Sequence, residues 1–286
     1  MSVADIESEM QEIYGINLST SAISIITNKV SQAATEWQNR PLDSLYMIVW
    51  MDGIVFKVRE NGKVINKTVY LCVGLNKEGL KEVLGMWIGK NESAAFWMGV
   101  LTDLKARGVE DILITVTDNL NGFTETIKSV FPASTTQICV VHQIRNSCRY
   151  VVWKEKKEFT ADLKNIYNAP TKEAAEMELD NFEQKWGAKY PYAIRSWRNN
   201  WEELTVFFDF PVEIRKIIYT TNLIENLNGK IRKYTKNKLS FPNDDALKKS
   251  VYLAINEIEK KWYQPIWNWA LIFNQFITIF ENRIQV

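Results

Sequence analysis

The chain has 286 residues, of which 46% are hydrophobic and 12% are aromatic. This length and composition exclude a disordered tail and predict a substantial core with two or three structural units. The formal net charge is only +1, so binding to nucleic acid would depend on local basic patches. Three cysteines, and the lack of an apolar run near the roughly twenty residues of a membrane span, predict a cytoplasmic protein without membrane contact. The single histidine, His142, excludes a zinc finger with two histidines.

Residues 1–42 are predicted to form a helical segment of two helices. The first ends at Gly15, and the second begins at Ser19 or Thr20 and ends before Pro41, because proline disfavours helix at the residue before it. The pair is compatible with the remnant of a helix-turn-helix that binds DNA, or with a helical hairpin packed on the main domain. Apolar residues at helical spacing are Ile6, Met10 and Ile13, then Ile23, Ile26 and Val30.

Residues 43–150 show the pattern of a mixed α/β sheet, with three antiparallel strands followed by parallel strands and crossover helices. Asn61-Gly62 is a strong hairpin signal between the first two strands, because both residues tolerate positive φ. A helix begins after Ser93, another near Gly122 and a third at His142. The predicted strands are 47–51 with its continuation 54–59, then 64–75, 82–88, 111–117 and 137–141.

The rest of the chain is predicted to be helical. Residues 151–215 are predicted as an all-helical insertion, and residues 216–286 as C-terminal helices of the core. Asn243 begins a long helix through Trp262, and Pro265 begins another that runs to about Phe280. The regular spacing of large residues in the last helix predicts that they are core, namely Trp267, Trp269, Leu271, Phe273 and Phe276.

Three carboxylates come from three separate elements. Asp52 lies in or just after the first strand, Asp118 follows the fourth, and Glu225 lies on a helix with Ile224, Leu227 and Ile231 on its apolar face. If the two strands are neighbours, the aspartates converge at the carboxyl end of the sheet. The structural alternatives are that Asp52 serves a bend, that Asp118 caps the next helix, and that Glu225 closes a capping box with Asn222.

Hard oxygen ligands of this kind predict a site for Mg²⁺ or Mn²⁺. Two such ions can activate a water or a 3′-hydroxyl and stabilise the leaving oxygen of a phosphodiester. His142 lies where it could orient a water or contact a phosphate, with a structural hydrogen bond as the alternative. A zinc site from Cys139, Cys148 and His142 lacks the usual pairs of ligands.

A local excess of cations follows Glu225. Between Lys216 and Lys238 there are six Lys or Arg residues against this single acid, which suits a polyanionic partner. In the insertion, Trp197 and Arg198 either stack on an unpaired base or, alternatively, pack between helices with Arg198 solvated. The residues expected to contact the DNA backbone are Lys230, Arg232, Lys233, Lys236 and Lys238.

Four motifs, in this order along the whole chain, resemble those of the Mutator-type transposases of bacterial insertion sequences. They are Trp50-Met-Asp52-Gly-Ile54, Thr117-Asp118-Asn-Leu-Asn-Gly122, Cys139-Val-Val-His142-Gln-Ile-Arg145-Asn146 and Thr220-Thr-Asn-Leu-Ile-Glu225-Asn-Leu-Asn228. The resemblance implies an RNase H-like core with an Asp-Asp-Glu triad, interrupted by a helical insertion. It maps the triad to Asp52, Asp118 and Glu225, and the family's Cys-x-x-His signature to Cys139 and His142, with Asn228 near the site.

The resemblance also implies partners and two departures from the family pattern. Double-stranded DNA, as element ends and as target, is the expected substrate, and a dimer or higher oligomer is expected because two ends must be held together. Asn119 stands where glycine usually follows the second aspartate. Members usually carry a longer DNA-binding region upstream, so this copy is expected to be N-terminally truncated.

Three functions remain open from the sequence. The first is a metal-dependent transposase that cleaves DNA and transfers the strand. The second is a truncated DNA-binding or oligomerising regulator of transposition, and the third is an RNase H-like nuclease without strand transfer.

Overall fold

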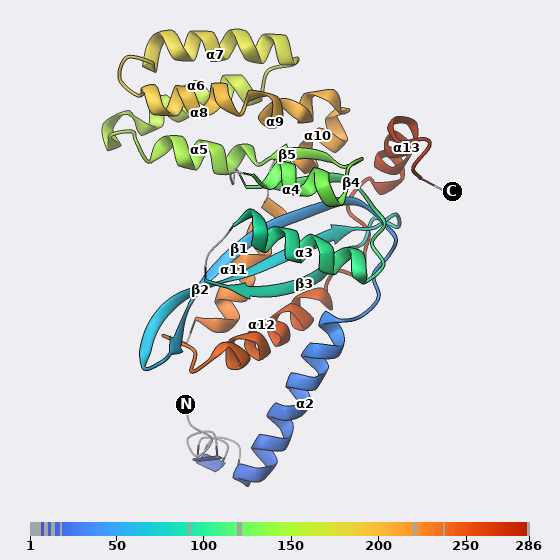
Figure 1. The fold of residues 1–286 in the computed structure, drawn as a ribbon. Helices are drawn as coiled ribbons and strands as arrows, with labels where there is room; N and C mark the ends of the chain where they lie inside the picture. The colour runs from blue at the N-terminus through green and yellow to red at the C-terminus, as the bar shows by residue number, and fades with distance from the viewer. Residues whose placement is uncertain are drawn as a thin grey trace.

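A five-stranded mixed sheet forms the centre of the computed structural model, which describes residues 7–8, 11–12, 15–17, 19–90, 93–118, 122–219, 222–236 and 238–284 (Figure 1). The strand order is β3-β2-β1-β4-β5; the first three strands pair antiparallel, whereas β4 pairs parallel with β1 and with β5. The predicted mixed α/β architecture is therefore confirmed. The strands are β1 (Leu45–Glu60), β2 (Lys63–Leu75), β3 (Lys81–Gly89), β4 (Asp111–Thr117) and β5 (Thr135–Ile138).

Helices cover both faces of this sheet (Figure 1). One core lies between the sheet and helices α3 and α4, and the other between the sheet, α11, α12 and the helices of the insertion. The helices are α2 (Thr20–Gln38), α3 (Ala94–Ala106), α4 (Phe123–Val130), α5 (Val140–Cys148), α6 (Lys156–Tyr167), α7 (Lys172–Trp186), α8 (Pro191–Asn199), α9 (Trp201–Thr205), α10 (Val212–Ile218), α11 (Asn222–Thr235), α12 (Asp244–Glu259) and α13 (Trp269–Ile279).

Strand β1 runs without a break through the position where the sequence suggested a bend. Asp52 and Gly53 pair with Leu71 and Tyr70 of β2. A Cβ atom on Gly53 would lie 2.7 Å from Cγ2 of Thr68, so the close approach of the two strands requires glycine here. The predicted Asn61-Gly62 turn is confirmed, with φ of +49° and +77°.

Residues 151–215 contain helices and no strand, and lie above the sheet in Figure 1. A buried glutamine, Gln137 of β5, ties these helices to the sheet. Its side chain donates to the carbonyl oxygen of Leu204 at 2.9 Å and accepts from the backbone nitrogen of Phe207 at 2.7 Å. The division of the chain into units at residues 42, 150 and 215 stays a prediction.

Several predicted boundaries are wrong. Strand β5 ends at Ile138, because Cys139 is already the N-cap of α5, and the apolar residues after it belong to the first turn of that helix. Helix α12 ends at Glu259 instead of Trp262, and α13 begins only at Trp269. The core prediction fails for Trp267, which precedes the helix and is 88% exposed, and for Leu271, which is also exposed.

Helix α2 projects from the body of the molecule in Figure 1, and it packs on α12 through the rings of Trp37 and Tyr252 and through a 3.2 Å hydrogen bond from Ser31 to Asp245. Ser19 is the N-cap, as predicted, and accepts from the backbone nitrogen of Ala22 at 3.2 Å. The first predicted helix falls largely outside the described residues, so the helix-turn-helix stays a prediction. In the described part of the chain, no helix is long and apolar enough to cross a bilayer.

Candidate active site

Asp52 lies in the middle of β1 with a side chain that is almost buried. The residue is 9% exposed, and its Oδ1 accepts a 2.7 Å hydrogen bond from the backbone nitrogen of Gly53. Its Oδ2 accepts a second bond of 2.7 Å from the side-chain amide of Asn228 on α11. Both oxygens are therefore held in place, one by the strand and one by a helix from the far end of the sequence.

Asp118 follows directly on β4, the parallel neighbour of β1. Trp50 pairs with Val116, so the two aspartates, each two residues further on, come out at the same edge of the sheet. The N-cap of α4 is Gly122 and makes no side-chain capping bond, so the capping interpretation of Asp118 is wrong. The predicted convergence of these two carboxylates is confirmed.

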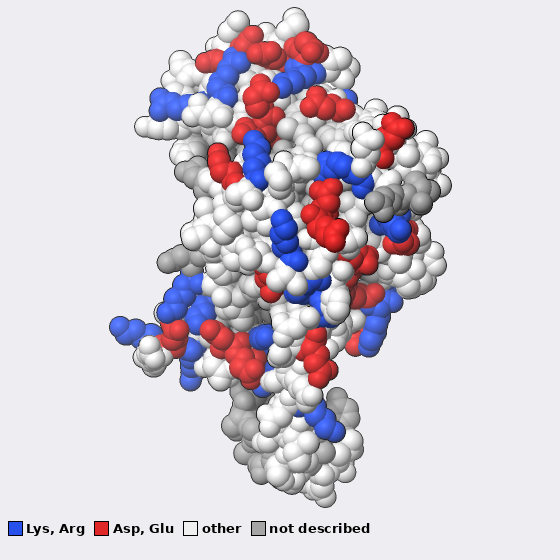
Figure 2. Space-filling model, turned by 45° about the vertical axis from the view of Figure 1, so that its right-hand side comes forward, with Lys and Arg blue, Asp and Glu red and all other residues white. Residues whose placement is uncertain are grey.

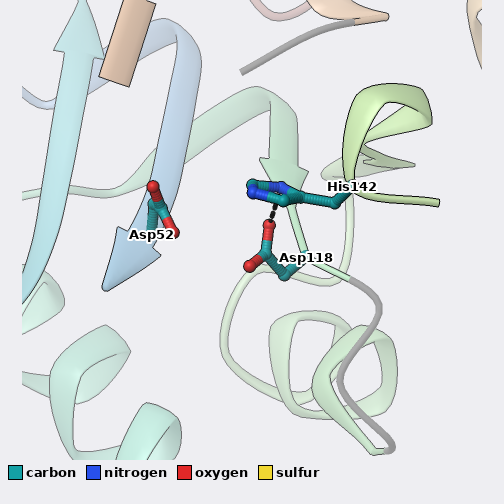
Figure 3. A group of neighbouring side chains, drawn as sticks. All are labelled: Asp52, Asp118 and His142. Carbon is teal, nitrogen blue, oxygen red and sulfur yellow. Dashed lines mark ion pairs between the residues drawn. The ribbon is translucent and has the colours of Figure 1, made fainter. Parts of the chain in front are cut away.

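His142, on α5, completes a group with the two aspartates (Figure 3). One ligand atom from each of the three side chains lies within 4.8 Å of the others. Nδ1 of His142 forms an ion pair with Oδ1 of Asp118. Burial by itself lowers the pKa of His142, but the adjoining Asp118 carboxylate and Cys139 thiol outweigh burial and raise it to about 11. The imidazole is therefore a cation at neutral pH and forms an ion pair with Asp118.

Glu225 reaches this group from α11. The apolar face of the helix, formed by Ile224, Leu227 and Ile231, is buried against the sheet as predicted. Both carboxylate oxygens of Glu225 are bound by the guanidinium of Arg145 on α5, and Nη2 lies 2.9 Å from Oε2. Oε1 also lies 3.5 Å from Nε2 of His142. His142 thus stands between Asp118 and Glu225, and the three predicted acids gather around it.

Burial and neighbouring negative charge change the ionisation of Asp52. Burial is the main cause that raises its pKa, to about 7, and the neighbouring charges of Asp118 and Glu225 add to it. His142 and the Gly53 amide act in the opposite direction. In the absence of a further cation, Asp52 is therefore about half protonated near pH 7.

Comparison with known proteins shows the family to which the chain belongs. Residues 1–265 match the family described as "Transposase, Mutator family". The chain belongs to the Mutator family of transposases. It is 43% identical over 284 residues to the transposase for insertion sequence element ISRM3 of Rhizobium meliloti, covering 99% of this chain and 71% of the relative. It is 40% identical over 262 residues to a probable transposase for an insertion sequence element of Corynebacterium diphtheriae, covering 91% of this chain and 76% of the relative.

The side chains of this Mutator-family site fit a divalent cation. Carboxylate oxygens are the ligands that hard cations prefer, and they converge here from β1, β4 and α11. Within the described residues, Oδ1 of Asn228 is buried without a hydrogen-bond partner, and the nitrogen of the same amide donates to Asp52, so a further oxygen atom lies close to the acids. The group of potential ligands contains neither Cys139 nor Cys148, which gives no support to a zinc site.

The cations predicted to contact DNA lie on two sides of α11. At 100° per residue, Arg232 shares the side of Glu225, seven residues earlier. Lys230 and Lys233 face α12 instead and, together with Tyr234 and Lys261, line a groove of about 360 Å³. Lys236 and Lys238 are exposed beyond the end of the helix. Figure 2 shows charges of both signs interspersed over one face of the molecule.

The stacking prediction for Trp197 is wrong in this structure. The indole is 1% exposed, and its Nε1 donates a 3.0 Å hydrogen bond to Ser147. The side chain of Arg198 is 33% exposed, and its guanidinium pairs at the surface with Asp180 and Glu183 of α7. The alternative, packing between helices, is confirmed for Trp197, and Arg198 fastens one helix of the insertion to another.

Arg145 lies in the motif from Cys139 to Asn146, but it was not among the residues predicted for the site. The available signal was its spacing: Arg145 follows His142 by three residues, so both side chains project from the same side of α5. The sequence prediction also missed Tyr234 and Lys261, whose shared groove depends on how α11 packs on α12.

Proposed function

We propose that this chain is a DNA transposase that cleaves at the ends of an insertion sequence and joins the 3′-hydroxyl to target DNA by in-line transesterification. The observation that carries the proposal is the gathering of Asp52, Asp118 and Glu225 around His142 at one edge of the sheet. Family membership supports DNA as the substrate, and the acids support Mg²⁺ or Mn²⁺, in a pair of ions, as the cofactor.

We also assign the sheet to the RNase H-like class. Support comes from the strand order, in which the antiparallel hairpins β1–β3 are followed by the parallel strands β4 and β5. The first acid lies within β1, the second lies just after its parallel neighbour β4, and the third comes from a helix that packs on the sheet.

Each acid has a residue that positions it. Asn228 and the Gly53 amide orient the carboxylate of Asp52, His142 orients Asp118, and Arg145 orients Glu225. A bound divalent cation would supply electrostatic stabilisation of the attacking and leaving oxygens of the phosphodiester. The imidazolium of His142 adds a fixed positive charge next to the reacting phosphate, where negative charge develops.

The DNA would approach over α5 and α11. The side chains of Asp118 and Arg145 are partly open to solvent there, so a phosphate can reach them. Arg232 lies on the same side of α11 as Glu225, and Lys230, Lys233 and Lys261 extend the positive charge into the groove with α12. Such contacts provide affinity for phosphates without choice of sequence. We expect the active form to be a dimer, because two element ends must be joined.

The test is a strand-transfer assay with Mg²⁺ on element-end DNA, run beside Asp118→Asn. A control is Asp209→Asn, which changes an exposed aspartate of the insertion. The proposal predicts joined product with the unchanged chain and with Asp209→Asn, and none with Asp118→Asn. Binding without cleavage would instead identify a regulator, and nicking without joining would identify a nuclease.

A further inference from the structure

Helix α5 presents two cations to the candidate site, one helical turn apart. His142 holds Asp118, and Arg145 holds both oxygens of Glu225. Because the two side chains lie three residues apart, they project from the same side of α5 toward the acids. The carboxylate of Glu225 is thus already engaged before any divalent cation arrives.

A divalent cation and Arg145 compete for the same carboxylate in the absence of DNA. The guanidinium already holds both oxygens of Glu225, so a divalent cation bound there would lie beside another positive charge. Two cations this close are favourable only if one leaves or if an anion arrives, because like charges repel strongly in a partly buried site.

Arg145 is the cation that can leave. Its side chain is 56% exposed, whereas those of Glu225 and His142 are 21% and 19% exposed. An exposed ion pair contributes little to stability, so it separates at small cost. The planar guanidinium also matches a phosphate as well as it matches a carboxylate, since both accept two parallel N–H bonds.

We propose that Arg145 is a positioning residue that makes cation binding conditional on DNA. In the free protein its guanidinium occupies Glu225; a DNA phosphate draws it away, and Glu225 becomes available to the cation. The inference rests on the proposed function, because it takes the acids to be the cation site. By linkage, DNA and the cation then strengthen each other's binding.

The experiment measures Mn²⁺ binding to the full chain by electron paramagnetic resonance, with and without a short linear DNA duplex. We expect the duplex to tighten Mn²⁺ binding about tenfold in the unchanged chain, within the usual range of coupling. Arg145→Gln should bind Mn²⁺ about tenfold more tightly without DNA and gain about twofold or less from the duplex. Asp118→Asn with duplex gives the background of Mn²⁺ bound by the DNA itself.

The matched control is Arg149→Gln, which removes an exposed arginine just after the same helix and should behave like the unchanged chain. Arg145→Lys keeps the charge but loses the two-pronged contact, so its Mn²⁺ affinity should fall between the two. The inference is overturned if Arg145→Gln binds Mn²⁺ equally or more weakly without DNA, or if the duplex has no effect on the unchanged chain. Strand transfer is measured in a separate assay. If DNA tightens Mn²⁺ binding as expected but no strand transfer occurs, the transposase proposal is rejected and the role of Arg145 in cation binding stands.

Discussion

The side-chain amide of Asn228 donates a 2.7 Å hydrogen bond to Oδ2 of Asp52, across 176 residues of sequence. This bond fixes α11 on β1 at the point where the helix also carries Glu225, three residues earlier. This contact between helix and sheet therefore helps to orient two of the three acids.

Replacing Asn228 should test this contact. In Asn228→Ala, Oδ2 of the nearly buried Asp52 loses its donor, so we expect a loss of about 1–3 kcal/mol in the free energy of unfolding. Strand transfer should fall about 10–100-fold, the usual effect of removing a residue that orients a metal ligand. Urea denaturation and the transfer assay measure the two effects. Asn226→Ala, on the exposed side of the same helix, should change neither.

The raised pKa of Asp52 predicts how stability depends on pH without metal. The pKa of Asp52 is 3.8 in the unfolded chain and about 7 in the folded protein, so between these pH values only the folded protein keeps the proton on Asp52. The free energy of unfolding is therefore greatest at low pH and declines as pH rises through the folded pKa of about 7. The full shift corresponds to about 4 kcal/mol. Urea denaturation in EDTA between pH 4 and 8 should show that the stability of Asp52→Asn increases relative to that of the unchanged chain as pH rises. Parallel curves would show that burial of Asp52 costs nothing.

Cation affinity should have the opposite dependence on pH. A divalent cation must displace the proton from Asp52, so its affinity should weaken as pH falls below about 7, by up to about tenfold per pH unit. Mn²⁺ titrations at several pH values in this range give the slope. A slope close to zero would mean that Asp52 is not a ligand.

Trp197 should matter for folding and not for DNA. Its indole is buried and bonded to Ser147, so Trp197→Ala should cost about 3–5 kcal/mol of stability. Trp153→Ala, which removes an indole that is almost fully exposed, should stay within about 0.5 kcal/mol. Chemical denaturation compares the two variants. A stable Trp197→Ala protein with weakened binding to single-stranded DNA would restore the stacking hypothesis.

The groove between α11 and α12 should contribute phosphate contacts. Replacing both Lys230 and Lys233 by glutamine should weaken duplex binding equally for all sequences and reduce the slope of log affinity against log salt by about 2. Lys260→Gln, which removes a lysine already paired with Glu257, is the control and should leave the slope unchanged. Binding isotherms at several salt concentrations provide the comparison.

The parts of the fold that local patterns determine were predictable from the sequence. Spacing within short segments predicts the Asn61-Gly62 turn, the change from antiparallel to parallel strands and the apolar face of α11. The convergence of Asp52 and Asp118 needed one further rule, that parallel strands bring their carboxyl ends to one edge. Catalytic roles for these acids are still proposals.

What the sequence could not predict depends on contacts between distant segments. Arg145 meets Glu225 across 80 residues, and no local pattern specifies that pairing. Trp197 and Trp267 both lie in segments predicted to be helical, yet one is buried between helices and the other is exposed, because burial depends on which helix packs nearby. The start of α5 was missed because Val140 and Val141 fit a buried strand as well as a buried helical turn.

The buried amide of Gln137 has a mechanical consequence. Its nitrogen donates to Leu204 and its oxygen accepts from Phe207. Directional bonds of this kind resist sliding of one element over another, whereas apolar contacts do not. The insertion is therefore anchored to β5, and α5, with His142 and Arg145, starts just beyond the end of that strand. The helices of the insertion and the two residues that hold Asp118 and Glu225 thus share one attachment to the sheet.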